Sequence, residues 1–372
     1  MRGDYVKTKI LILINTLQGG GAERVVQILS KKFVRMGMEV TIVTLEKAPI
    51  EYEFDTNIKI VHLKTGIFNK GIGKFINIPL QALELIKVIK MEKPNSIISF
   101  LIRANLVNAF TRHYGMRYKL ILSERTTATN LYKEKKMKNV YMVKLIKHLY
   151  RKADNIIAIS NSVKDSLIEF GVNEEKIKVI YNPIDGKNGS VRKVKSDANR
   201  IITVGRLINS KDHINLLKAF VRVREKIPNA TLEIVGKGEL FDFIKEQISE
   251  LGVSDSVQLT GWSSNPVENL RESDLFVLSS KFEGFGNVIL EAMSVSLPII
   301  STDCYGPSEI LDNGKYGVLV PIEDDKKLGD SIIRMLSLEN EYKQYSEMSM
   351  KRINDFNIES ISNQYLEVIL SQ

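Results

Sequence analysis

The chain has 372 residues, of which 44% are hydrophobic and 26% are charged, with a formal net charge of +9. This length predicts two or three domains, and the composition is typical of a soluble globular protein. No apolar run approaches the roughly 20 residues that span a bilayer, and the single cysteine, Cys304, excludes an internal disulfide and fits a reducing compartment.

The first predicted element is a buried strand over Lys9–Asn15. Two lysines precede its apolar residues, as in a secretion signal, but the apolar stretch is short and runs directly into polar residues and glycines. A buried strand explains this pattern better than a cleaved peptide does. We therefore expect a cytoplasmic protein.

A glycine turn follows this strand and precedes a predicted helix over Ala22–Met36. Gly19, Gly20 and Gly21 let a ligand approach the backbone, and the N–H groups of the helix terminus could bind a phosphate or a hydroxyl. The spacing differs from the G-x-G-x-x-G dinucleotide fingerprint. A tight strand–helix turn without a ligand explains the glycines equally well.

Short apolar runs then alternate with segments of helical period along the chain. Further strands are predicted at Glu39–Leu45, Ile58–Leu63, Ser96–Phe100, Leu120–Ser123, Asn155–Ile159, Ile177–Ile180, Arg200–Val204, Thr231–Val235, Val257–Thr260, Leu275–Leu278, Pro298–Ser301 and Gly317–Val320. Helices such as Ile78–Lys90 and Ile214–Lys226 fall between them. Buried strands alternating with helices predict an α/β fold with parallel sheets.

A boundary is expected where this alternation stops. Residues 185–199 lack an apolar period and are rich in Gly, Asn, Ser and Lys, which is typical of a linker. We predict two doubly wound, Rossmann-like domains, 1–184 and 200–352, facing across a cleft.

Two cations follow the first strand of the second domain. Arg206 and Lys211 lie five positions apart on the loop that leaves Arg200–Val204, where they could converge on one diphosphate. A pair of unrelated surface cations is the alternative reading. Their place at a strand's carboxyl end favours binding.

The strongest motif is Phe-Glu-Gly-Phe-Gly-Asn-Val-Ile-Leu-Glu at residues 282–291. Glu283 lies in a glycine loop before a predicted helix, and Glu291 lies one turn into that helix. Carboxylates suit sugars because they accept charge-assisted hydrogen bonds from hydroxyl groups. Two ordinary charges near a helix terminus would not explain the surrounding glycines and phenylalanines.

These motifs together resemble the family 4 glycosyltransferases of the GT-B fold, in the group that builds lipid-linked surface polysaccharides. The resemblance covers about residues 9–352, in family order. The matching segments are Gly19–Glu23, Ile159–Ser162, Tyr181–Pro183, Gly205–Leu207 with Lys211, Gly236–Glu239, Gly261, Glu283 with Glu291, and Gly306–Ile310.

The resemblance implies a role for each matching residue. Arg206 and Lys211 hold the donor diphosphate and offset charge on the leaving group, Glu283 contacts donor-sugar hydroxyls, and Glu291 holds the ribose. It further implies transfer with retention of configuration, from a nucleotide sugar that is most often a UDP-sugar. It also implies a C-terminal helix, within 353–372, that packs back on the first domain. The residues so assigned to donor binding are Gly20, Gly21, Gly205, Gly236, Gly238, Glu239, Gly284, Phe285, Gly286, Asn287 and Glu291.

One position departs from the family pattern. Relatives carry a histidine near the reacting sugar where this chain has Arg125, after the predicted strand Leu120–Ser123. A guanidinium can bind a hydroxyl or a phosphate but cannot act as a base near neutral pH. Glu124 and Arg125 are therefore candidate acceptor-side residues.

We expect no metal and no cofactor beyond the nucleotide-sugar cosubstrate. The chain has no Asp-x-Asp pair after a strand, and its four histidines show no ligand spacing. The acidic run 323–325 precedes a helix and is typical of a charged helix N-terminus. Arg206 and Lys211 would then supply the positive charge at the diphosphate.

Charge is divided unevenly between the two predicted domains. Residues 1–195 carry a net charge of +18, and residues 196–372 carry −9. The basic half could meet an anionic membrane surface and a polyprenyl-diphosphate acceptor, at the cytoplasmic face of the inner membrane. A solvated basic face is the alternative. Eight cations lie within 20 residues and are interleaved with apolar residues, as in a basic amphipathic helix: Lys133, Lys135, Lys136, Lys138, Lys144, Lys147, Arg151 and Lys152. Lys70, Lys74, Lys87 and Lys90 extend the positive surface.

Two other functions fit parts of the pattern. A sugar-nucleotide 2-epimerase shares the GT-B architecture and the donor, but it needs no acceptor. A nucleic-acid-binding protein would explain the basic half, but it predicts aromatic stacking platforms or a reading helix, and neither is apparent.

Overall fold

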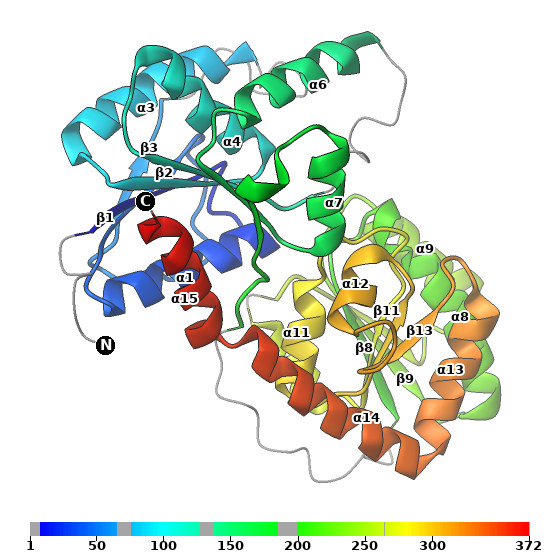
Figure 1. Ribbon diagram of the computed structural model, residues 1–372. Coiled ribbons are helices and arrows are strands. Elements are labelled where there is room, and N and C mark those ends of the chain that lie inside the picture. Colours follow the sequence, from blue (N-terminus) through cyan, green and yellow to red (C-terminus); the bar gives the residue numbers. More distant parts are fainter. Residues whose placement is uncertain (1–7, 65–75, 127–136, 185–198, 264, 372) are drawn as a thin grey trace. The chain divides into compact units, whose positions relative to one another are not determined.

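The computed structural model describes residues 8–64, 76–126, 137–184, 199–263 and 265–371. The chain divides into two compact units (Figure 1). Unit 1 comprises Met1–Pro183 and Ile358–Gln372, and unit 2 comprises Ile184–Asn357. The C-terminal segment thus belongs to the first unit. The predicted linker lies outside the described residues, except for Asn199.

Unit 1 alternates strands and helices from its first strand onward. Its elements are β1 (Lys9–Ile14), α1 (Gly21–Arg35), β2 (Glu39–Thr44), β3 (Lys59–His62), α3 (Ile78–Glu92), β4 (Ser96–Phe100), α4 (Ile102–Phe110), η1 (Thr111–Tyr114), β5 (Lys119–Glu124), α6 (Met137–Tyr150), β6 (Asn155–Ala158), α7 (Asn161–Glu169), η2 (Glu174–Lys176), β7 (Ile177–Val179) and α15 (Ile358–Leu370).

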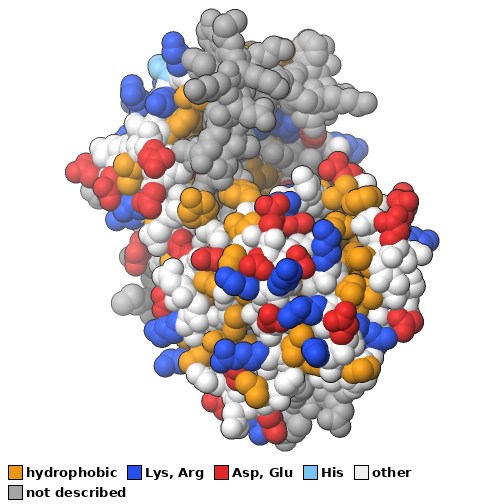
Figure 2. All heavy atoms as spheres, turned by 90° about the vertical axis from the view of Figure 1, so that its right-hand side faces the viewer, with side chains coloured by type: hydrophobic (Ala, Val, Ile, Leu, Met, Phe, Trp, Pro, Cys, Tyr) orange, Lys and Arg blue, Asp and Glu red, His pale blue; other side chains and the backbone are white. Residues whose placement is uncertain are grey.

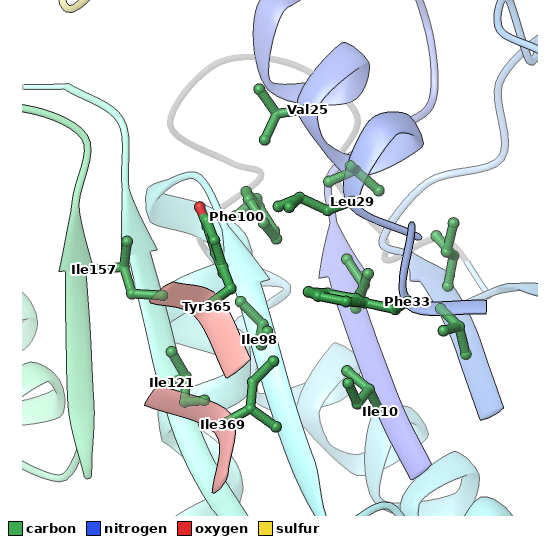
Figure 3. Close-up of a cluster of buried hydrophobic side chains, with 14 of the residues drawn as sticks. Ile10, Val25, Leu29, Phe33, Ile98, Phe100, Ile121, Ile157, Tyr365 and Ile369 are labelled. Carbon is green, nitrogen blue, oxygen red and sulfur yellow. The ribbon is translucent and has the colours of Figure 1, made fainter. Parts of the chain in front are cut away.

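The strands of unit 1 form one parallel sheet in the order β3-β2-β1-β4-β5-β6-β7. Helices α3, α4 and α6 lie on one face, and α1 and α15 lie on the other (Figure 1). Figure 3 shows Phe33 of α1 and Tyr365 of α15 over Ile98 of β4. Each large apolar side chain so buried stabilises the fold by about 1.5–3 kcal/mol. This core fixes α15 on unit 1.

Unit 2 repeats the same alternation with a smaller sheet. Its elements are β8 (Arg200–Val204), η3 (Asn209–Lys211), α8 (His213–Lys226), β9 (Thr231–Val235), α9 (Phe241–Glu250), β10 (Val257–Gly261), α10 (Pro266–Glu272), β11 (Leu275–Leu278), α11 (Asn287–Ser294), β12 (Ile299–Thr302), α12 (Tyr305–Ile310), β13 (Val318–Val320), α13 (Asp325–Ser337), α14 (Glu339–Arg352) and η4 (Ile353–Phe356).

The sheet of unit 2 is also parallel, in the order β10-β9-β8-β11-β12-β13. Apolar residues of α8, α9 and α13 share one buried cluster with its strands. Outside that core, the face drawn in Figure 2 carries Lys and Arg side chains interspersed with Asp and Glu. Ion pairs of unit 2 include Arg222–Asp330 and Arg224–Asp255.

The predicted fold class is confirmed, because both units are parallel α/β sheets wound by helices. The strand order of unit 2 reverses between β8 and β11. Ligands of open parallel sheets bind beyond the carboxyl ends of the strands at such a reversal. The loops that leave β8 and β11 carry Lys211 and Glu283, so the fold brings these two residues to one edge.

Candidate active site

An ion pair joins the two loops at the reversal of the unit 2 sheet. Lys211 Nζ contacts Glu283 Oε2, and the two side chains keep only 13% and 19% of their surface exposed. They lie 72 positions apart in the sequence. Partial burial strengthens this pair relative to a surface ion pair, because less water screens the charges. The predicted diphosphate cation and sugar-binding carboxylate are therefore direct neighbours.

Hydrogen bonds hold the loop after β8 and the loop after β11 together. The backbone N–H of Lys281 donates to the carbonyl oxygen of Ser210 at 2.9 Å, and Ser279 Oγ lies 3.0 Å from the carbonyl oxygens of Lys211 and Asp212. Asp212 adopts a left-handed conformation with φ 46°. Sequence analysis assigned Ser279 and Asp212 no role, since nothing in the local pattern indicates which loop each one meets.

The loop after β8 crosses the glycine turn after β9 at very short range. A Cβ atom built on Gly236 would lie 1.8 Å from the carbonyl oxygen of Gly205, and one on Gly238 would lie 2.2 Å from that of Leu207. The N–H of Leu207 donates to the carbonyl oxygen of Lys237 at 3.0 Å. These glycines are thus required by the crossing of two backbones. Gly238 and Glu239 themselves are exposed.

A second close crossing supports the Glu283 loop. The N–H of Gly306, in α12, donates to the carbonyl oxygen of Glu283 at 3.2 Å, and a Cβ on Gly306 would lie 2.5 Å from the carbonyl oxygen of Phe285. Gly286 has φ 102° and begins α11 as its N-cap. The motif containing Gly306 was part of the family resemblance, but its support of Glu283 is visible only in the folded chain.

The other predicted donor-binding residues lie around this ion pair. Phe285 is buried and its ring meets that of Phe356 edge-on, with centroids 6.0 Å apart. Gly284, Asn287 and Glu291 are half-buried at the start of α11 and just before it. Arg206 is exposed, and in the described part of the chain it makes no ion pair. The structure therefore pairs Lys211 with Glu283 and leaves Arg206 exposed on the loop that leads from β8 to Lys211.

Two neutral groups lie beside the ion pair. Burial, followed by the charge of Lys211, lowers the pKa of His213 to about 4. Burial is the main cause that raises the pKa of Cys304 to about 12, and the nearby Glu283 carboxylate contributes to the increase. At neutral pH the imidazole and the thiol are both uncharged. Neither group adds charge beside Lys211.

An exposed aromatic residue stands at the carboxyl end of β10. Trp262 keeps 43% of its surface exposed, and Lys237 Nζ lies 4.7 Å from its ring centroid. Lys237 belongs to the turn Gly236–Glu239, which the family resemblance places near the nucleotide base. Trp262 was not among the predicted site residues. The contact places it beside this turn.

A hollow of unit 2 lies away from the Lys211–Glu283 ion pair. It has a volume of about 890 Å³, and the first residues of three strands, Arg200, Thr231 and Val257, line it. Amino ends and carboxyl ends of parallel strands lie at opposite edges of a sheet, so this hollow is remote from the Lys211–Glu283 pair. None of the predicted site residues lines it.

The predicted acceptor-side residue Glu124 is buried inside unit 1. Its side chain is 1% exposed, and it accepts hydrogen bonds from the Tyr150 hydroxyl at 2.5 Å and from the backbone N–H of Arg125 at 2.9 Å. Burial raises the pKa of Glu124 above its ordinary value. With its oxygen atoms turned inward, Glu124 anchors the end of α6 to the end of β5 in this structure.

Arg125 is also buried, with 7% of its surface exposed. Its guanidinium donates to Asn182 and to the Tyr365 hydroxyl of α15, and it lies 4.7 Å from the ring centroid of Phe100. The Nε atom of Arg125 has no hydrogen-bond partner among the described residues. Arg125 thus ties the C-terminal helix to the sheet of unit 1, and its acceptor-side role stays a prediction.

Replacement of Tyr150 by phenylalanine tests this buried network. We expect unit 1 to lose about 1–3 kcal/mol of stability at pH 8, because a buried carboxylate loses a donor. The Tyr150 hydrogen bond lowers the pKa of Glu124, so its loss raises the folded-state pKa further. A raised folded-state pKa destabilises the fold as pH rises above the ordinary value of 4.5, so the loss is smaller at pH 4.

Urea unfolding of both proteins, followed by circular dichroism at pH 4 and pH 8, measures this difference. Tyr114→Phe is the matched control, because Tyr114 is 47% exposed. Equal losses of stability at the two pH values would contradict the inferred hydrogen bond between Tyr150 and the Glu124 carboxylate.

The glycine turn before α1 is held by the segment between β2 and β3. Glu51 Oε2 accepts a hydrogen bond from the N–H of Gly19 at 2.6 Å, and the Tyr52 hydroxyl donates to the carbonyl oxygen of Gly20 at 3.2 Å. Gly20 itself is extended, with φ −168°. Sequence analysis assigned no role to Glu51 or Tyr52, because each lies 32 positions from the residue it binds.

Known families match the two halves of the chain. Residues 19–187 match the family described as Glycosyltransferase Family 4, and residues 187–352 match the family described as Glycosyl transferases group 1.

Similar proteins match between three quarters and nearly all of the chain. An N-acetylgalactosamine-N,N'-diacetylbacillosaminyl-diphospho-undecaprenol 4-alpha-N-acetylgalactosaminyltransferase of Campylobacter jejuni is 29% identical over 97% of this chain and 99% of its own length. An uncharacterized glycosyltransferase of Methanocaldococcus jannaschii is 32% identical over 76% of this chain and 80% of its own length.

Solved structures show the same fold. Anabaena Alr3699/HepE in complex with UDP and glucose has a TM-score of 0.80 at 20% identity, over 98% of this chain and 100% of its own. The lipopolysaccharide outer core galactosyltransferase WaaB has a TM-score of 0.73 at 21% identity, over 97% and 99%. With both halves matched in order, the chain belongs to the family 4 glycosyltransferases of the GT-B fold.

Proposed function

We propose that this glycosyltransferase moves a hexose or N-acetylhexosamine from a UDP-sugar to a polyprenyl-diphosphate-linked glycan, with retention of configuration, in surface polysaccharide or glycan biosynthesis. The observation that carries the proposal is the Lys211–Glu283 pair at the strand reversal of unit 2. A cation suits a diphosphate, and a carboxylate suits sugar hydroxyls.

The similar proteins support the two substrates. Anabaena HepE binds UDP and glucose, and the Campylobacter relative acts on a diphospho-undecaprenol-linked glycan. Both substrate classes carry phosphate, which the basic first half of this chain would attract. An acceptor of this kind places the reaction at the cytoplasmic face of the inner membrane. In the described ranges, no helix is long and apolar enough to cross a membrane.

The proposed transfer needs no protein nucleophile. The acceptor hydroxyl oxygen bonds to the anomeric carbon on the face that the diphosphate leaves, and the hydroxyl proton passes to the departing phosphate oxygen. Negative charge grows on that diphosphate as its bond breaks. We propose that Lys211 and Arg206 stabilise this charge, while Glu283 orients the sugar and Glu291 the ribose.

Positive charge for the diphosphate would come from the protein in this proposal. The described residues contain no group of three or more His, Cys, Asp and Glu that could hold a metal ion. Activity measured with and without EDTA tests the prediction of metal independence. A loss of turnover in EDTA that added divalent ion restores would contradict it.

The alternative functions predict different results. A 2-epimerase would interconvert UDP-sugars without an acceptor. A nucleic-acid-binding protein would bind random DNA with a steep salt dependence and would bind no sugar nucleotide. The glycosyltransferase proposal therefore predicts UDP release that depends on an added lipid-linked acceptor.

The single tryptophan offers a direct test of donor binding. We expect its fluorescence to change and saturate as UDP is added, because Trp262 stands beside the turn that would hold the base. A panel of UDP- and GDP-sugars with lipid-linked acceptors then measures turnover. If no member of the panel binds or turns over, the proposed function is wrong.

A further inference from the structure

One helix of unit 1 leaves large apolar side chains in the solvent. On α3, Leu80, Leu83 and Met91 are 47%, 41% and 64% exposed, and Ile76, two residues ahead of the helix, is 62% exposed. The opposite side of α3 is buried through residues such as Leu85 and Ile89. The helix therefore has two apolar sides, and the core of unit 1 uses only one.

Lysines continue this outward stripe along the helix. At about 100° per residue, Leu80, Leu83, Lys87, Lys90 and Met91 fall within an arc of about 100°. Both lysines are exposed. The two acidic residues of α3, Glu84 and Glu92, are half-buried, and Glu92 pairs with Lys59 at 2.5 Å. The stripe thus combines bulky apolar side chains with positive charge.

Helix α6 belongs to the basic segment for which sequence analysis weighed a membrane surface against a solvated face, and it is built differently from α3. Its described apolar residues Ile146, Leu149 and Tyr150 are buried, and Lys147 Nζ lies 5.1 Å from the ring centroid of Phe170. The side chains of residues 133–142 lie outside the described structure. Val143 and Leu145 are half-buried, and Lys144 and His148 are the exposed residues among the described side chains of α6. The described part of α6 therefore packs into unit 1 and leaves no large apolar side chain fully exposed.

We propose that the outward stripe of α3 docks on an anionic lipid bilayer, with Leu80 and Leu83 entering the interface and Lys87 and Lys90 meeting the headgroups. This inference rests on the proposed lipid-linked acceptor, which would hold the enzyme at such a surface. A helix that presents both apolar and basic residues on its free side can bind in the plane of a membrane interface. The stripe is Leu80, Leu83, Lys87, Lys90 and Met91, with Ile76 before it.

Flotation of the full chain with vesicles tests the stripe. We expect binding to phosphatidylglycerol/phosphatidylcholine vesicles and much weaker binding to pure phosphatidylcholine. Lys87→Gln with Lys90→Gln should weaken binding about thirtyfold, because each lysine near an anionic surface contributes about fivefold. Leu80→Gln with Leu83→Gln should weaken it about tenfold, through lost apolar contact.

Unit 2 offers a matched control. Phe243 and Lys245 of α9 are both exposed, as an apolar and a basic residue two positions apart. The double variant Phe243→Gln with Lys245→Gln should bind the vesicles like the unaltered chain. Thermal unfolding of all variants shows whether the fold is kept.

Three outcomes would overturn the proposal. The unaltered chain could fail to bind anionic vesicles, all variants could bind them equally well, or the Phe243/Lys245 control could lose as much vesicle binding as the α3 variants. Self-association that the leucine variant abolishes, without vesicle binding, would assign the stripe to a second copy of this chain. The UDP response of Trp262, measured on the same samples, separates the two proposals. If the chain binds vesicles but no nucleotide, the docking proposal stands and the proposed function is wrong.

Discussion

Lys211→Ala is expected to lower the turnover number by about 100- to 1000-fold, the effect of removing one group that stabilises transition-state charge. The lost ammonium group would leave the departing diphosphate without its half-buried cation, and Arg206 is exposed and makes no ion pair in the described structure. Glu283 would also lose its partner. Initial rates with the best donor–acceptor pair of the panel measure the effect.

Glu283→Gln is the companion change, and a similar loss is expected. The double variant should be little worse than either single variant, because residues that act as one unit are not additive. Lys218→Ala, on the exposed side of α8, is the matched control and should keep full activity. Full activity in both single variants would show that the site lies elsewhere.

Gly236→Ala is expected to abolish donor binding and to destabilise unit 2 by several kcal/mol. The added Cβ would lie 1.8 Å from the carbonyl oxygen of Gly205, where neither backbone can move without breaking the loop crossing. Urea unfolding followed by Trp262 fluorescence reports on this unit, and UDP titration reports on the site.

Gly252→Ala separates this clash from the ordinary cost of replacing a glycine. Gly252 has φ 68°, but a Cβ there meets no atom within 4 Å. Its replacement should cost about 1–2 kcal/mol from the left-handed backbone alone and should leave UDP binding intact. If Gly236→Ala loses no more stability or UDP binding than this control, the close crossing of the two backbones does not require a glycine at position 236.

Both experiments concern contacts that local patterns do not predict. The cations and carboxylates after β8 and β11 stand out in the sequence because glycines and strand ends surround them. Which cation meets which carboxylate depends on the strand order, and that order places β11 beside β8 although β9 and β10 intervene in the sequence. The family resemblance assigned Gly236 to donor binding, and the structure adds a physical requirement for a glycine there, because the backbone of Gly205 passes so close.

The predicted acceptor-side residues Glu124 and Arg125 depend even more on contacts that local patterns do not predict. Glu124 and Arg125 are polar residues at the end of a strand, which favours an open binding site, yet both are buried. Tyr150 lies 26 positions from Glu124, and Tyr365 lies 240 positions from Arg125. Only the packing of α6 and α15 on the sheet decides that these partners cover them.

By itself, the amino-acid sequence determined the alternation of buried strands and helices, the parallel sheets and the ordered motifs of a family 4 glycosyltransferase, because these depend on local periodicity and spacing. Tertiary structure alone decided that Lys211 pairs with Glu283, that Tyr365 of α15 meets Arg125, and that α3 rather than the described part of α6 has an exposed apolar side. Burial and pairing depend on contacts between distant segments, and only the folded chain specifies these contacts.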